Sequence, residues 1–92
     1  MLEIKFTASM KRDLKRLRKQ GKDMEKLRAI LLQLAAGQSL PPNHRDHPLA
    51  GDKKACRECH VEPDWLLVYQ IQQAELVLLA IATGSHADLF GM

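Results

Sequence analysis

The fold is decided by residues 56–65, CRECHVEPDW, which we interpret as a strand, a tight turn and the start of a second strand. Glu-Pro-Asp at 62–64 makes the turn, since proline and aspartate both favour turns. A run rich in branched and aromatic residues continues from the turn to residue 71. Strands joined by so short a turn pair antiparallel, so the sequence predicts a hairpin over residues 54–71.

Segments on both sides of the hairpin predict further strands and two helices. Residues 2–6 alternate between apolar and charged as a half-buried strand does, and residues 75–83 form a last strand-like run. Apolar residues recur at helical spacing in residues 10–17 and 24–34. Helix caps and ends are predicted at Thr7 or Ser9, Gly21, Asp23 and Gly37. The expected fold class is α+β, with an N-terminal strand and an antiparallel helix hairpin packed on an antiparallel β-sheet.

The composition is that of an ordinary globular protein. A chain of 92 residues, 46% hydrophobic and 27% charged, predicts one domain over residues 1–92. The sequence has no secretory leader at its start, and its longest apolar run, residues 76–82, is too short to cross a bilayer. We therefore expect a cytoplasmic protein without membrane contact, whose two cysteines are thiols.

The same decisive stretch contains C-x-x-C-H, the attachment signature of a c-type haem. Covalent haem attachment takes place outside the cytoplasm, which weighs against that interpretation. Cys56 and Cys59 lie on opposite faces of the predicted strand, so they are poorly placed to bind one metal ion. A zinc site that adds His44 and His47 lacks the usual second ligand pair. We therefore expect no metal and no cofactor.

Positive charge is concentrated at one end of the chain. Residues 1–28 carry ten Lys and Arg against four Asp and Glu, whereas residues 29–92 carry four against seven. Such a block can bind a phosphate backbone or an acidic protein, although a solvated helix face would have the same composition. The candidate contacts to such a partner are Lys11, Arg12, Lys15, Arg16, Arg18, Lys19 and Lys22.

Histidines and carboxylates could meet at one end of the predicted sheet. Glu58 and His60 share a strand face, and Asp64 follows at the turn. His47 lies in an irregular loop predicted at 38–52, and His86 in a short tail after the last strand. Such groups suit RNA cleavage without a metal, because a base can take the ribose 2′-hydroxyl proton and an acid can protonate the leaving 5′-oxygen. Each residue taken alone could instead have a structural role.

Four short blocks of the sequence carry a resemblance to a known family. They are DHPL at 46–49 followed by Gly51, RECH at 57–60, PDWLLVY at 63–69, and TGSH at 83–86 followed by Leu89 and Phe90. In this order the blocks resemble the YafQ branch of the RelE/ParE toxin superfamily, almost from end to end. The resemblance implies a RelE-like fold of the microbial-ribonuclease type. It also implies a type II toxin that cuts mRNA on the ribosome.

The resemblance implies a set of site residues and partners. The catalytic set falls on His47, His60, Asp64 and His86, with His60 and Asp64 in proton transfer and His86 as the acid. The substrate-binding candidates are Phe90, which matches an aromatic thought to orient the substrate base, and Arg57, Lys53, Lys54, Glu58 and Trp65. The implied partners are the ribosome, mRNA and a cognate antitoxin encoded by an adjacent gene, which would form a hetero-oligomer with the toxin.

Two positions depart from the family pattern. Lys53-Lys54-Ala55 stands where the family often has tryptophan followed by Lys-Gly, and Ala82 stands where it commonly has an arginine. An arginine there would bind the scissile phosphate. Two alternatives to an active nuclease follow: an attenuated or inactive relative that binds antitoxin or ribosomal RNA, and a ParE-like gyrase inhibitor, which needs no histidine cluster.

Overall fold

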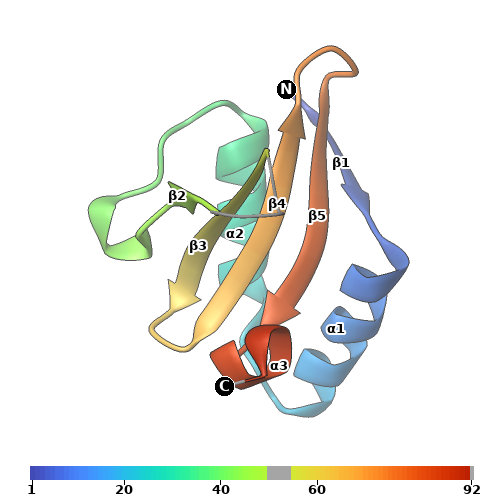
Figure 1. Ribbon diagram of the computed structural model, residues 1–92, viewed down its shortest axis with the longest axis vertical. Coiled ribbons are helices and arrows are strands. Elements are labelled where there is room, and N and C mark those ends of the chain that lie inside the picture. Colours follow the sequence, from blue (N-terminus) through green and yellow to red (C-terminus); the bar gives the residue numbers. More distant parts are fainter. Residues whose placement is uncertain (50–54, 92) are drawn as a thin grey trace.

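A mixed five-stranded sheet with two helices against one face makes up the computed structural model, which describes residues 1–49 and 55–91 (Figure 1). The elements in chain order are β1 (Glu3–Phe6), α1 (Ala8–Lys19), α2 (Met24–Ala35), the 3-10 helix η1 (Pro42–His44), β2 (His47–Pro48), β3 (Cys56–Glu62), β4 (Trp65–Gln72), β5 (Val77–Gly84) and α3 (His86–Phe90). No helix of the described residues is long and apolar enough to span a membrane.

The sheet has the strand order β1-β5-β4-β3-β2. The predicted hairpin and the predicted last strand are confirmed, because β4 pairs antiparallel with both β3 and β5. One pairing differs from the prediction: β1 runs parallel to β5, so the sheet is mixed. A four-residue edge strand has no feature in its own sequence that fixes its direction. The short β2, which pairs with β3, was not predicted either.

Both long helices begin where side chains can cap them. The Thr7 side chain accepts a hydrogen bond from the backbone nitrogen of Met10, so Thr7 and not Ser9 caps α1. The Asp23 side chain accepts one from the nitrogen of Glu25 and caps α2, as predicted. The predicted tail at 85–90 is helical: Ser85 forms a capping box that starts α3. This short helix carries His86 at its first residue.

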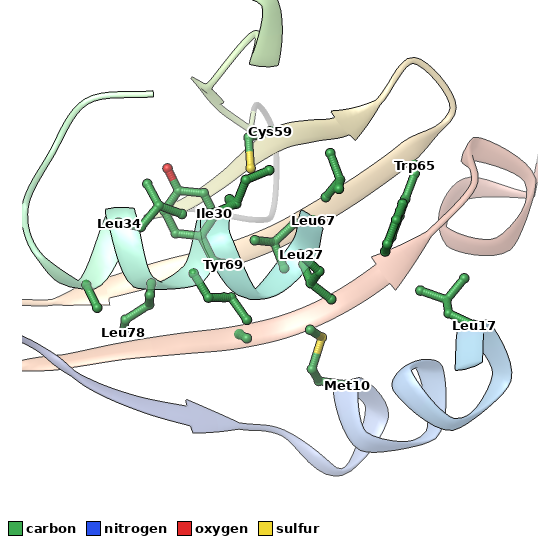
Figure 2. Packing of buried hydrophobic residues seen from close by; sticks show 14 residues of the cluster. Met10, Leu17, Leu27, Ile30, Leu34, Cys59, Trp65, Leu67, Tyr69 and Leu78 are labelled. Carbon is green, nitrogen blue, oxygen red and sulfur yellow. The ribbon is translucent and has the colours of Figure 1, made fainter. Parts of the chain in front are cut away.

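One apolar core lies between the helices and the sheet (Figure 2). Met10 and Leu17 enter it from α1, and the sheet contributes Cys59, Trp65 and Tyr69, all 1% exposed or less. Burial raises the pKa of the Cys59 thiol to about 12, so the sulfur carries its proton at neutral pH. A protonated thiol in an apolar core is suited neither to haem attachment nor to metal binding.

The buried state of Cys59 predicts a large difference in reactivity between the two cysteines. With a pKa of about 12, the thiolate fraction of Cys59 at pH 8 is about 10⁻⁴. We expect iodoacetamide to alkylate the half-buried Cys56 of the folded protein at least about 10³-fold faster than Cys59. Peptide mass spectrometry over time measures both rates, and unfolding in urea should equalise them. Equal rates in the folded protein would contradict this placement of Cys59.

Candidate active site

Two rows of paired residues cross the sheet on the face opposite the helices. The strand register aligns His47, Glu58, Val68 and Ala82 in one row and His60, Leu66 and Gly84 in the next. Paired residues of antiparallel strands point to the same face. Their neighbours along the strands, such as Cys59 and Leu67, belong to the core under the helices. Ala82 therefore shares what we call the histidine face with Glu58 and His60.

Asp64 and His86 form a hydrogen-bonded pair where the β3–β4 turn meets the start of α3 (Figure 1). The Asp64 Oδ1 atom lies 2.7 Å from the Nδ1 atom of His86 and also accepts the backbone N–H of His86 at 3.1 Å. These hydrogen bonds hold the pKa of Asp64 below its usual value, so this carboxylate is ionised at neutral pH. The bond to Nδ1 orients the imidazole, and its Nε2 atom forms no hydrogen bond or ion pair within the described residues.

His60 lies beside this pair, with its ring centroid 5.9 Å from that of His86. The Nδ1 atom of His60 lies 3.2 Å from the carbonyl oxygen of Pro63. A carbonyl oxygen only accepts hydrogen bonds, so Nδ1 must carry the proton of the neutral ring. The Nε2 atom of neutral His60 then has a free lone pair that can accept a proton. One histidine can thus act as a base beside another that is held by a carboxylate.

His47 is the member of the predicted catalytic set that lies farther away. Its strand, β2, is at the edge of the sheet, and its side chain is half exposed. The Nε2 atom of His47 lies 3.6 Å from the Oε1 atom of Glu58, and that oxygen is 3.9 Å from the Nε2 atom of His60. The buried Glu58 carboxylate therefore lies between the two histidines, at distances too long for hydrogen bonds. Three of the four predicted residues are close together, and the fourth lies on the other side of Glu58.

The other predicted substrate contacts are placed differently. Arg57 projects to the helix side, where its Nε atom donates to Asp46 at 3.2 Å, so it lies away from His60 as strand alternation predicts. Trp65 is buried and donates its indole N–H to Thr83 Oγ1 at 3.0 Å, which makes it a core residue. Phe90 is the last residue of α3 and is half-buried. Lys53 and Lys54 lie outside the described residues.

A polar network that the sequence analysis missed anchors the end of β5. Buried Asp13 accepts the backbone N–H of Thr83 at 3.1 Å and the Nη1 atom of Arg16 at 2.8 Å. The Nη2 atom of Arg16 donates to the Thr83 carbonyl at 3.0 Å and lies 3.5 Å from Asp88 of α3. The guanidinium of Arg16 is therefore bound to groups of the protein itself, so Arg16 is not part of the basic surface that a partner could contact. The network holds the strand end and the helix that carries His86.

Gly84 lies against this network. An added Cβ at Gly84 would lie 2.6 Å from the Arg16 Nη2 atom and 2.9 Å from the Cβ of Asp88. We expect Gly84→Ala to lower the free energy of unfolding by about 2–3 kcal/mol, because it forces Arg16 and α3 apart. Urea denaturation measures the change. Gly37→Ala is the control: its φ is +78° but no atom lies within 4 Å, so only about 1 kcal/mol should be lost. Equal losses of unfolding free energy in the two variants would contradict a steric clash at residue 84.

Comparisons with known proteins identify the family of the chain. A family model described as bacterial toxin of type II toxin-antitoxin system, YafQ, matches residues 2–91. The mRNA interferase toxin YafQ of Escherichia coli K12 is 39% identical over 90 residues, which cover 97% of this chain and 96% of that protein.

Solved structures show the same fold. A metal-bound toxin from Helicobacter pylori has a TM-score of 0.94 and 46% identity, covering 98% of this chain and 100% of that one. The toxin of the E. coli DinJ–YafQ complex has a TM-score of 0.90 and 37% identity, covering 99% and 100%. Family match, identity and coverage together lead to one conclusion: the chain belongs to the YafQ family of bacterial toxins from type II toxin–antitoxin systems.

Proposed function

We propose that this chain is an mRNA interferase, the toxin of a type II toxin–antitoxin pair, and that it cuts mRNA bound to the ribosome. Its curated E. coli relatives bear the name mRNA interferase toxin. The observation that carries the proposal for this chain is the Asp64–His86 pair beside His60, 5.9 Å from ring to ring. Two imidazoles this close can act on the same phosphate group, one as a base and the other as an acid.

The proposed chemistry transfers two protons and needs neither metal nor cofactor. The free Nε2 lone pair of His60 takes the proton from the ribose 2′-hydroxyl, and the 2′-oxygen forms a bond to phosphorus. The bond from phosphorus to the 5′-oxygen breaks, and protonated His86 supplies a proton to that oxygen. Asp64 already accepts two bonds from His86, so its role is to orient and stabilise the imidazolium. His47 is the fourth residue of the proposed set, and its Nε2 atom lies 3.6 Å from the Oε1 atom of Glu58.

The partners follow from the family and from charge. In the E. coli relative the toxin was solved in complex with DinJ, and we propose a corresponding antitoxin, encoded by an adjacent gene, for this chain. The basic surface available to an antitoxin or ribosomal RNA excludes Arg16 and consists of Lys11, Arg12, Lys15, Arg18, Lys19 and Lys22. Because its substrate would be mRNA under translation, we propose that the protein acts in the cytoplasm.

In vitro translation with the purified chain tests the proposal. Primer extension on the message should reveal cleavage that needs ribosomes and stops when the antitoxin is added. Ala82 favours one other function, a non-catalytic protein that binds antitoxin or ribosomal RNA; salt-sensitive binding without any cleavage would support it. A gyrase inhibitor would keep its toxicity when His60 and His86 are replaced together, which would exclude the interferase.

A further inference from the structure

A cavity of about 310 Å³ opens beside His60, between η1 and the end of β3. Asn43, His44 and Arg45 form one wall, and residues 60–63 form the other. His60 therefore borders both the histidine face and this cavity. A single-stranded RNA whose cleaved bond lies between His60 and His86 can place a neighbouring nucleotide over this cavity.

Hydrogen bonds of two histidines connect the wall that contains Arg45 to the active site. The Nδ1 atom of His44 lies 2.6 Å from the carbonyl oxygen of His60, and that of His47 lies 2.5 Å from the carbonyl oxygen of Arg45. Both acceptors are carbonyls, so both Nδ1 atoms donate. The backbone N–H of Arg45 also donates to the Pro42 carbonyl at 3.1 Å. Arg45 is thus held at a defined place relative to His60 and His47.

Arg45 is the cation of this wall, and no carboxylate of the described residues is paired with it. Its side chain is exposed and forms no ion pair among the residues that the structure describes. The acidic residue of the cavity, Glu62, is already paired with Lys26 at 2.7 Å and with Lys22 at 4.0 Å. Arg45 also has φ 47° and ψ 44°, a left-handed conformation that arginine adopts at a cost. Strain of this kind is concentrated at functional sites.

The other arginines near the sheet are engaged elsewhere. Arg16 is bound to Asp13 and Thr83, and Arg57 is bound to Asp46 on the helix side. The pocket beside Asp64 is lined by the carboxylates of Glu62, Asp64 and Asp88 and by one cation, Lys22. Its formal charge is negative, so a phosphate is favoured more beside Arg45 than in that pocket. Within residues 1–49 and 55–91, Arg45 is the arginine that shares a cavity with His60.

We propose that Arg45 and this cavity bind the RNA backbone phosphate of the nucleotide next to the cleaved bond. The inference rests on the proposed interferase function and adds a binding residue to it. A guanidinium can donate two parallel hydrogen bonds to one phosphate, which gives orientation as well as charge. Arg45 would thereby align the substrate. It would contribute to binding the strand and not to the proton transfers.

Binding of a short 2′-O-methyl RNA, which has phosphates but no 2′-hydroxyl to react, tests the contact directly. Arg45→Asn removes the charge and keeps a residue that tolerates the left-handed conformation. We expect about tenfold weaker binding at low salt and a decrease of about 0.7 in the slope of log K against log salt concentration, the value for one single-strand phosphate contact. Arg45→Lys should keep most of the slope. Lys5→Gln, which removes a charge at the opposite edge of the sheet, should change neither.

Cleavage on programmed ribosomes separates this inference from the proposed function. Arg45→Asn should raise the half-saturating toxin concentration about tenfold and leave the maximal rate within about threefold. An unchanged half-saturating concentration, a fall in the maximal rate alone, or an equal effect of Lys5→Gln would overturn the role of Arg45. If the unsubstituted chain cuts no message but its RNA binding still depends on Arg45, the interferase proposal fails and the binding site stands. Urea denaturation of each variant verifies that it is folded.

Discussion

Replacing His86 with glutamine is expected to lower the rate of mRNA cleavage on ribosomes by about 10²- to 10⁴-fold, the range for loss of a general acid. The His86 imidazole is oriented by Asp64 at 2.7 Å and lies beside His60, where it can protonate the leaving 5′-oxygen. Glutamine can still donate to Asp64 but cannot supply a proton near neutral pH. Primer extension under single-turnover conditions measures the rate, with the amount of bound toxin determined separately.

Asp64→Asn provides the matched comparison for His86→Gln. The amide oxygen of asparagine can still accept the two bonds from His86 but has no charge to stabilise the imidazolium. If Asp64 orients and stabilises His86, this variant should cut more slowly than the unsubstituted chain and faster than His86→Gln. The double variant should cut only slightly more slowly than His86→Gln alone, because the two residues act as a unit. A fully additive double variant would show that Asp64 transfers a proton by itself.

Much of the fold was predictable because strong local signals agree with it. The Glu-Pro-Asp turn fixes the β3–β4 hairpin, and the caps at Thr7 and Asp23 fix where two helices begin. The direction of β1 depends on pairing with β5, more than 70 residues away, and no local pattern encodes it. The two-residue β2 is too short for any periodicity. The helix α3 did have a signal, since Ser85 and Asp88 have the spacing of a capping box.

The site was predictable in its composition and less so in its geometry. His60, Asp64 and His86 come from separate blocks, and the structure brings them together. That Arg57 faces away from His60 followed from strand alternation alone. The hydrogen bond of Arg16 to Thr83 could not be predicted, because α1 carries several basic residues and only the fold shows which of them meets Thr83. The roles of the site residues stay predictions until variants are measured.

Replacing Ala82 with arginine is expected to raise the cleavage rate by about 10- to 100-fold. Ala82 pairs with Val68 and lies in the same row as Glu58 on the histidine face, next to the row of His60. It is partly exposed, so a longer side chain can extend over the face toward a phosphate held by His60 and His86. Removing one preorganised donor to a developing anion costs about 10²–10³ in rate, and an added arginine should recover part of that.

The control for Ala82→Arg is Ala82→Gln, which adds a polar side chain of similar reach without the charge. If charge on the phosphorane is what the chain lacks, glutamine should give at most a few-fold gain, since neutral donors are about half as strong as ionised ones. Adding His86→Gln to Ala82→Arg should abolish the gain, because the arginine stabilises charge but moves no proton. Equal gains from arginine and glutamine would mean that Ala82 leaves a gap that any larger side chain can fill. No gain from either would mean that the histidines already meet the electrostatic demand of the reaction.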